Sequence, residues 1–87
     1  MSMNETTIDV AEVKAVLVKT FDIEDRADAL DADTPLTSIP EVDSLAVLEL
    51  VLDLERHFGI TVEDDDVTAE VFDTIGTLAA YVDSKSR

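Results

Sequence analysis

A single amphipathic helix between Asp43 and Gly59 constrains the fold of this chain more than any other segment. Pro40 disfavours helical backbone at the residue before it, so a helix is not expected to run through that point. Asp43 is a preferred residue type for an N-cap, and Gly59 readily adopts the left-handed conformation that commonly ends a helix. These signals predict a helix from about Ser44 to Phe58.

This helix carries two apolar stripes when its residues are placed at about 100° per residue. The wider stripe, which has the width of a core-facing surface, consists of Val47, Leu50, Val51, Leu54 and Phe58. The narrower one, here called the leucine stripe, consists of Leu45, Leu48 and Leu52, with Glu49, Glu55 and Arg56 at its borders. Either the leucine stripe is also buried, or it is an exposed docking surface with a charged rim. A short chain has few elements to cover a central helix on every side, which favours the docking surface.

Ser44 lies at the N-terminal end of the leucine stripe and allows two interpretations. A serine at a helix start is routinely a cap, but Asp43 is already placed to be the cap, and Val47 stands where a capping box would have Glu or Gln. Alternatively, Ser44 Oγ is a covalent attachment point. An anionic group there would lie beside the unpaired N–H groups and the positive dipole end of the helix, an interaction worth about 0.3–1 kcal/mol when exposed.

The segment Asp43-Ser44-Leu45, followed by a Leu/Val-rich helix and closed by Phe58-Gly59-Ile60, resembles the second helix of an acyl carrier protein. The resemblance extends over nearly the whole chain in length, helix order and charge. It implies that Ser44 carries 4′-phosphopantetheine through a phosphodiester and that the thiol of this arm holds acyl groups as thioesters. It also implies that Asp43 belongs to the motif recognised by a phosphopantetheinyl transferase. The positions at which such carriers contact their enzymes correspond to Leu45, Leu48, Glu49, Leu52 and Glu55, and Arg56 on the same rim completes the expected contact set.

Some residues depart from the family's usual patterns. Pro40-Glu41-Val42 stands where fatty-acid carriers often have a glycine before the aspartate, and Ala46 and Arg56 occupy positions that are often acidic. These departures point away from primary fatty acid biosynthesis and towards a specialised lipid or polyketide-type pathway. A freestanding aminoacyl or peptidyl carrier is the alternative, although the glycine pair that peptidyl carriers often show before the serine motif is absent.

Charge and composition restrict the partners and the chemistry. Six basic and twenty-one acidic residues give a formal net charge of −15, which repels nucleic acids and anionic membranes and attracts basic protein surfaces. Acidity as a solubility or halophilic adaptation explains the same number. The chain has no cysteine and no recognisable pair of nucleophile and base, so we expect no enzyme and no Cys-type metal site.

The segment that starts at Asp31 begins like an EF-hand calcium loop, but Pro35 and Leu36 occupy positions where that motif requires a ligand and a glycine, so we expect no calcium site. The single histidine, His57, is expected at the surface.

The remaining segments predict an all-α fold, a four-helix bundle with a short third helix and a long loop between helices 1 and 2. Helices are expected at about 8–20, 44–58, 65–71 and 75–83. Thr6 and Asp9 fit a capping box for the first helix, and Asp73 or Thr74 can cap the last. The loop at 22–42 is expected to be held by buried anchors, namely Leu30, Leu36 and Ile39. Residues 6–83 would form the carrier domain, with flexible tails at 1–5 and 84–87.

The expected partners are a phosphopantetheinyl transferase, an acyl- or aminoacyl-loading ligase, and synthase or acyltransferase enzymes with basic docking patches. With no signal-like or membrane-spanning apolar run, the expected location is the cytoplasm, and nothing indicates more than a monomer. The competing hypothesis is an unmodified acidic helical adaptor that binds a basic partner through the leucine stripe. The adaptor hypothesis differs in one respect, because it makes Ser44 dispensable.

Overall fold

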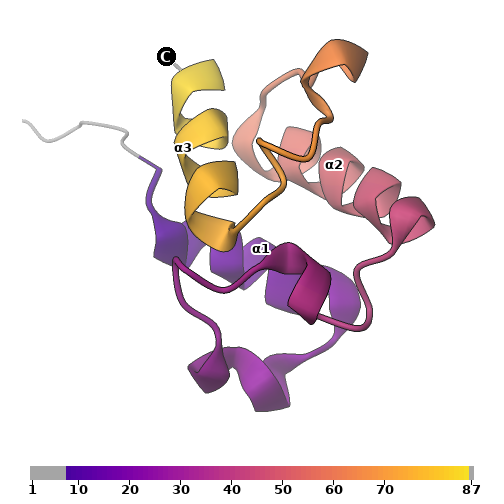
Figure 1. Ribbon diagram of the computed structural model, residues 1–87. Helices are drawn as coiled ribbons and strands as arrows, with labels where there is room; N and C mark the ends of the chain where they lie inside the picture. The colour runs from indigo at the N-terminus through magenta and orange to yellow at the C-terminus, as the bar shows by residue number, and fades with distance from the viewer. Residues whose placement is uncertain (1–7, 87) are drawn as a thin grey trace, which may run out of the picture.

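The computed structural model describes residues 8–86 and confirms the all-α fold. Its three α-helices are α1 (Val10–Phe21), α2 (Ser44–Phe58) and α3 (Ile75–Lys85) (Figure 1). Three short 3-10 helices are η1 (Glu24–Ala29), η2 (Leu36–Ser38) and η3 (Asp64–Asp66). The part of the chain that the structure describes contains no strand, only an isolated antiparallel bridge between Pro35 and Thr74. None of the helices in this part is long and apolar enough to cross a membrane.

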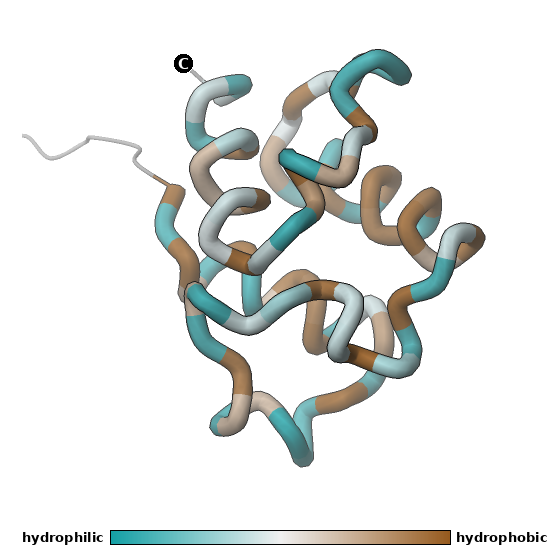
Figure 2. Tube along the Cα trace, viewed as in Figure 1, coloured by the Kyte–Doolittle hydropathy of each residue, from teal (hydrophilic) through white to brown (hydrophobic). Residues whose placement is uncertain are grey.

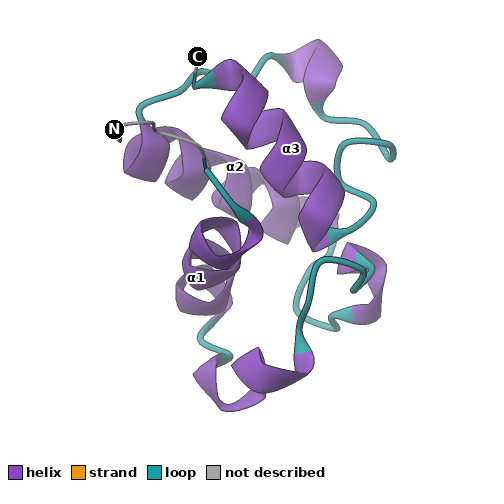
Figure 3. Cartoon of the chain, turned by 90° about the vertical axis from the view of Figure 1, so that its left-hand side faces the viewer, coloured by secondary structure: helices purple, strands orange, loops and turns teal. Residues whose placement is uncertain are grey.

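One hydrophobic core joins the three α-helices and the long loop. Helix α1 packs against both α2 and α3, as the turned view shows (Figure 3). Side chains with no exposed surface come from all three helices: Val13, Leu17, Leu50, Leu54, Ile75, Leu78 and Val82. The expected loop anchors Leu30, Leu36 and Ile39 are also buried, together with Ile23. The core therefore fixes both the helices and the loop that leads into α2.

Helix α1 begins two residues later than the predicted start at residue 8. Its N-cap is Asp9, whose side chain accepts a hydrogen bond from the Glu12 N–H at 3.1 Å. Asp9 was expected at the third position of a capping box with Thr6, and Thr6 lies outside the described residues. At the other end, Asp22 takes up a left-handed conformation (φ 56°) that ends the helix before Ile23. Asp tolerates this conformation better than most residues.

The beginning of α3 is fastened to the long loop through backbone contacts. Thr74 is the N-cap and forms a reciprocal capping box with Thr77. The Gly76 N–H donates to the Ala32 carbonyl at 2.8 Å, and a Cβ at position 76 would lie only 2.9 Å from that oxygen. Glycine lowers the helix propensity of this first turn, but position 76 has no room for a side chain because the loop approaches so closely. Helix α3 continues past the predicted end at 83, so Ser84 and Lys85 are helical; Arg87 lies outside the described residues.

The third helix is shorter than predicted. In place of an α-helix at 65–71, the chain forms the single 3-10 turn η3 and then a second turn closed by a 3.0 Å bond from the Phe72 N–H to the Thr68 carbonyl. Phe72 is buried and Val71 packs partly buried against the core, but Val67 is 36% exposed, so this stretch buries too little apolar surface to stabilise an α-helix. Tyr81 of α3 holds η3 in place by donating a 2.7 Å hydrogen bond to Asp66.

The titration of Tyr81 tests this placement of η3. Burial, and then the hydrogen bond to Asp66 and its negative charge, raise the pKa of Tyr81 to about 12. Because the folded pKa lies above the unfolded value near 10, Tyr81 stabilises the fold below about pH 10, and this contribution is lost as the pH rises towards 12. The chain has one tyrosine and no tryptophan, so tyrosinate absorbance reports this residue alone.

We expect the native protein to ionise Tyr81 near pH 12, and Asp66→Asn to lower that midpoint. The urea-unfolded protein serves as the control and should titrate near pH 10. A native midpoint close to that of the unfolded chain would show that Tyr81 does not hold η3.

Candidate functional site

The start of α2 places Ser44 at the first helical position, with Asp43 as the cap. Asp43 has an extended backbone, and its side chain accepts a hydrogen bond from the Ala46 N–H at 2.8 Å. The Asp43 carbonyl accepts from the Val47 N–H at 3.0 Å. Ser44 is exposed, and its Oγ forms no hydrogen bond with any residue in 8–86. The capping role therefore belongs to Asp43, as predicted, and the Ser44 hydroxyl is available.

The environment of Ser44 Oγ suits a bound anion. The backbone N–H groups of Ser44 and Leu45 have no acceptor among the described residues, since the cap satisfies only the next two. They belong to the N-terminus of a 15-residue helix, where the dipole favours negative charge. A phosphodiester attached to Ser44 would thus meet unpaired donors and a favourable field.

A surface pocket of about 380 Å³ opens beside Ser44, between the start of α2, η2 and the turn at 67–72. Its walls are mainly apolar and include Leu36, Val42, Val47 and Phe72, while Thr37 and Thr68 add hydroxyl groups. Sequence reasoning did not find this pocket. Its walls come from segments far apart in the chain, and no local periodicity reports how they meet.

The segment just before Asp43 is held by an ion pair between Arg26 of η1 and Glu41. The hydrogen bond from Arg26 holds the pKa of Glu41 below its usual value. A separate backbone bond of 2.9 Å joins the Leu36 N–H to the Asp73 carbonyl before α3. Both contacts restrain the loop that delivers Ser44 to its place.

The leucine stripe is exposed, as the docking-surface interpretation requires. Leu45 is 76% exposed, Leu48 56% and Leu52 55%, whereas Leu50 and Leu54 of the wider stripe are fully buried. Hydrophobic residues run along most of α2 (Figure 2), although only the wider stripe is turned into the core. Contact of the leucine stripe with a partner stays a prediction.

The three rim residues differ in their surroundings. Glu49 is exposed and has no ion pair within 8–86. Glu55 is half-buried and accepts a hydrogen bond from the Val62 N–H at 2.8 Å, so it also fastens the chain that turns back after α2. Arg56 pairs with Asp53 at 2.9 Å. A helical wheel cannot reveal the hydrogen bond between Val62 and Glu55, because Val62 lies in the segment after α2.

Two alanine variants separate the roles of Asp43 and Ser44 in stability. We expect Asp43→Ala to lower the free energy of unfolding by about 0.5–2 kcal/mol, because the Ala46 N–H loses its acceptor. Ser44→Ala should change the same quantity by less than about 0.5 kcal/mol, since its hydroxyl has no partner to lose. Urea unfolding measures both. An equal loss for the two variants would identify Ser44 as part of the cap.

Comparison with known proteins adds a family and several relatives. Residues 11–82 match the family model described as "Phosphopantetheine attachment site". An acyl carrier protein of an Exiguobacterium species is 51% identical over 43 residues, which are 49% of this chain and 52% of the relative. An acyl carrier protein of Thermotoga maritima is 40% identical over 43 residues, 49% of this chain and 51% of the relative. The matched part of the chain thus spans about half the length of these curated relatives.

Among solved structures, this chain is similar to a holo acyl carrier protein from Nitrosomonas europaea whose structure was determined by solution NMR. The TM-score is 0.80 at 35% sequence identity, and the match covers 87% of this chain and 93% of that one.

Proposed function

Because this chain belongs to the phosphopantetheine attachment family, we propose that it is an acyl carrier protein and that Ser44 carries 4′-phosphopantetheine. The observation that carries the proposal is the exposed Ser44 hydroxyl, free of hydrogen bonds within 8–86, at the first position of α2. The unpaired N–H groups beside it fit a phosphodiester. The similarity to a holo acyl carrier protein supports the same assignment.

The chain itself performs no reaction in this proposal. The attached arm would supply a thiol that holds cargo as a thioester, and partner enzymes would carry out the chemistry. Helix α2 anchors the arm at a fixed exposed point, and the arm reaches the active site of whichever partner is docked. A short flexible link raises the effective concentration of cargo there to the order of millimolar.

The pocket beside Ser44 supports an acyl cargo. Its walls are mainly aliphatic and aromatic and offer no charged side chain except Asp43 at its edge, so an apolar chain gains from entering it. An aminoacyl group carries an ammonium ion that would lose hydration among these apolar walls, where the Asp43 carboxylate lies only at the edge. We therefore favour a lipid or polyketide-type pathway over the aminoacyl alternative. The departures at Pro40-Glu41-Val42, Ala46 and Arg56 support a pathway other than primary fatty acid biosynthesis.

The proposed partners are a phosphopantetheinyl transferase, a loading ligase, and synthase or acyltransferase enzymes. They would contact a surface around the leucine stripe that comprises Asp43, Leu45, Leu48, Glu49, Leu52, Glu55 and Arg56. Three exposed leucines form a small contact, and the net charge of −15 accelerates the approach of basic surfaces. Such a contact suits brief visits by several enzymes in turn.

Covalent loading tests the proposal directly. The protein is incubated with coenzyme A, magnesium and a broad-specificity phosphopantetheinyl transferase, and its intact mass is measured. The wild type should gain one phosphopantetheine, and Ser44→Ala should gain none while keeping its helical circular dichroism. Ser84→Ala removes another exposed serine hydroxyl and is the matched control, which should load like the wild type.

Failure of loading would favour the adaptor hypothesis. The contradictory result is an unmodified, well-folded wild type with two unrelated transferases, because Arg56 on the rim can defeat one transferase without defeating another. Loading of Ser44→Ala would instead place the attachment point elsewhere.

A further inference from the structure

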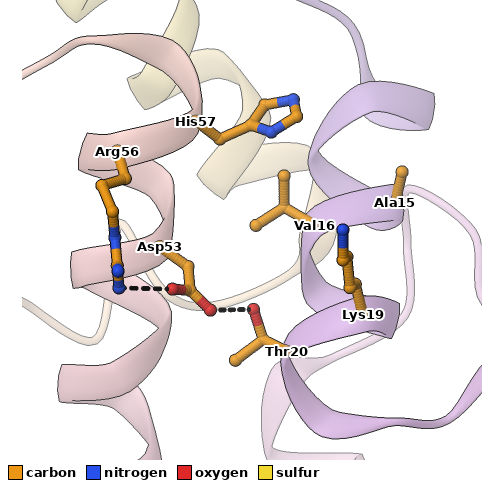
Figure 4. Close-up of a pocket in the computed structure, with 7 residues that line it drawn as sticks. All are labelled: Ala15, Val16, Lys19, Thr20, Asp53, Arg56 and His57. Atoms are coloured by element: carbon orange, nitrogen blue, oxygen red, sulfur yellow. Dashed lines mark hydrogen bonds and ion pairs between the residues drawn. The ribbon is translucent and has the colours of Figure 1, made fainter.

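A groove of about 610 Å³ runs between α1 and α2, on the side of α2 that adjoins the leucine stripe (Figure 4). Val16 lies on its α1 wall, and Lys19 and His57 extend from opposite walls. Arg56 borders both the groove and the leucine stripe, because it lies four residues after Leu52 on the surface of the same helix. The groove is thus a continuation of the proposed docking surface.

Asp53 is the one acidic side chain that lines the groove, and its carboxylate already has partners there. Asp53 Oδ2 accepts a hydrogen bond from Thr20 Oγ1 at 2.6 Å, and Oδ1 pairs with Arg56 at 2.9 Å (Figure 4). Both carboxylate oxygens are used, and the charge of Asp53 is balanced by Arg56. Lys19 therefore adds positive charge that nothing in the groove cancels.

Lys19 is unusual among the cations of this acidic chain. Of the six Lys and Arg residues, all but Arg87 are described. Four of these have an acceptor: Lys14 on the Leu30 carbonyl, Arg26 on Glu41, Arg56 on Asp53 and Lys85 near Asp66. Lys19 Nζ has no hydrogen bond or ion pair with any residue of 8–86, and neither does the His57 imidazole, which meets the Phe58 ring edge-on. Although the chain has twenty-one acidic residues, none of those described pairs with Lys19, so its ammonium group at the groove is available to a partner.

We propose that this groove docks a carboxylate-bearing segment of a partner enzyme. Carboxylates of the partner would pair with Lys19 and Arg56, while basic groups of the same partner meet Glu49, which lies on the same border of the leucine stripe as Arg56. The identity of the partner as an enzyme of the carrier's pathway rests on the proposed function. The contact as a whole has mixed charge, so a uniformly basic patch leaves Lys19 and Arg56 opposite like charges and is disfavoured.

The net charge of −15 does not prevent this contact. At physiological ionic strength the Debye length is about 8 Å, so acids elsewhere on the surface are largely screened from the groove. The titratable side chains that line the groove itself are Lys19, Arg56, His57 and Asp53, whose charge Arg56 balances. A helix-dipole role also suits these cations, since Lys19 is in the last turn of α1 and Arg56 is in the last turn of α2. The helix-dipole interaction would change only the free energy of unfolding, whereas the docking proposal also predicts that a partner binds.

Two designed peptides serve as probes in an NMR titration of the isotope-labelled protein at about 0.15 M ionic strength. Both are amphipathic helices with the same leucine face, one flanked by glutamates and the other by lysines. The glutamate peptide should shift the amide signals of Ala15–Thr20 and Asp53–His57, and the lysine peptide should shift those near Glu49.

A double variant tests the two cations. Lys19→Gln combined with Arg56→Gln should lower the affinity for the glutamate peptide roughly 3- to 30-fold. The control combines Lys14→Gln with Lys85→Gln, which removes the same charge outside the groove and should preserve that affinity.

Each other outcome overturns the proposal. No groove shifts with a large excess of the glutamate peptide would show that the groove does not accept carboxylates. An equal loss in both double variants would show that only net charge matters. Loading of Ser44 is measured separately on the wild type, so the two proposals fail independently: a loaded carrier with a silent groove refutes the groove alone, and an unloadable chain whose groove binds the glutamate peptide refutes the carrier alone.

Discussion

Burial of one face of α2 is the constraint on which the rest of the structure depends. Leu50 and Leu54 have no exposed surface and lie in the core that α1 and α3 complete. Because the helix has a fixed period, burying this face leaves Leu45, Leu48 and Leu52 outward and Ser44 at an open end. An exposed apolar stripe costs solubility, and an unused serine at the helix start adds nothing to the cap. Both features are understandable as parts of a docking and attachment surface.

The long loop gives this surface its fixed position. A loop that spans 22–43 would ordinarily leave the start of α2 poorly held. Here buried anchors, the ion pair of Arg26 with Glu41 and the close backbone contact of Ala32 with Gly76 tie the loop to the core and to α3. The capping residue Asp43 and the proposed attachment residue Ser44 follow immediately. The loop thus acts as a brace for the site, and the pocket beside Ser44 is formed where this brace meets the turn at 67–72.

Local signals in the sequence were sufficient to predict α2. Asp43 and Gly59 define both ends of that helix as predicted. The periodicity placed Leu50 and Leu48 in different stripes, and the structure shows that the first is buried and the second exposed. The all-α fold was confirmed by the structure, and the family resemblance by the family match over residues 11–82. Where the local signal is weak, the prediction was wrong in detail: the acidic run from 63 to 66 gave a 3-10 turn in place of an α-helix.

Features made by distant segments could not be predicted. The bond from Val62 to Glu55, the pocket beside Ser44 and the groove with Lys19 each join residues that no helical period connects. A helical wheel places Glu55 on the rim of the leucine stripe but cannot show that the chain returns to it. The interpretation of Lys19 likewise depends on knowing which acids it does not reach.

The most direct test of the two-faced helix compares Leu48→Ala with Leu50→Ala in urea unfolding. Both variants make the same change two residues apart in α2, so helix propensity contributes equally to each. Burial predicts a loss of about 2–5 kcal/mol in the free energy of unfolding for Leu50→Ala. An exposed Leu48 predicts a loss of less than about 1 kcal/mol. Similar losses for the two variants would mean that the leucine stripe is part of the core, and would contradict the account of α2 as a helix with one face reserved for partners.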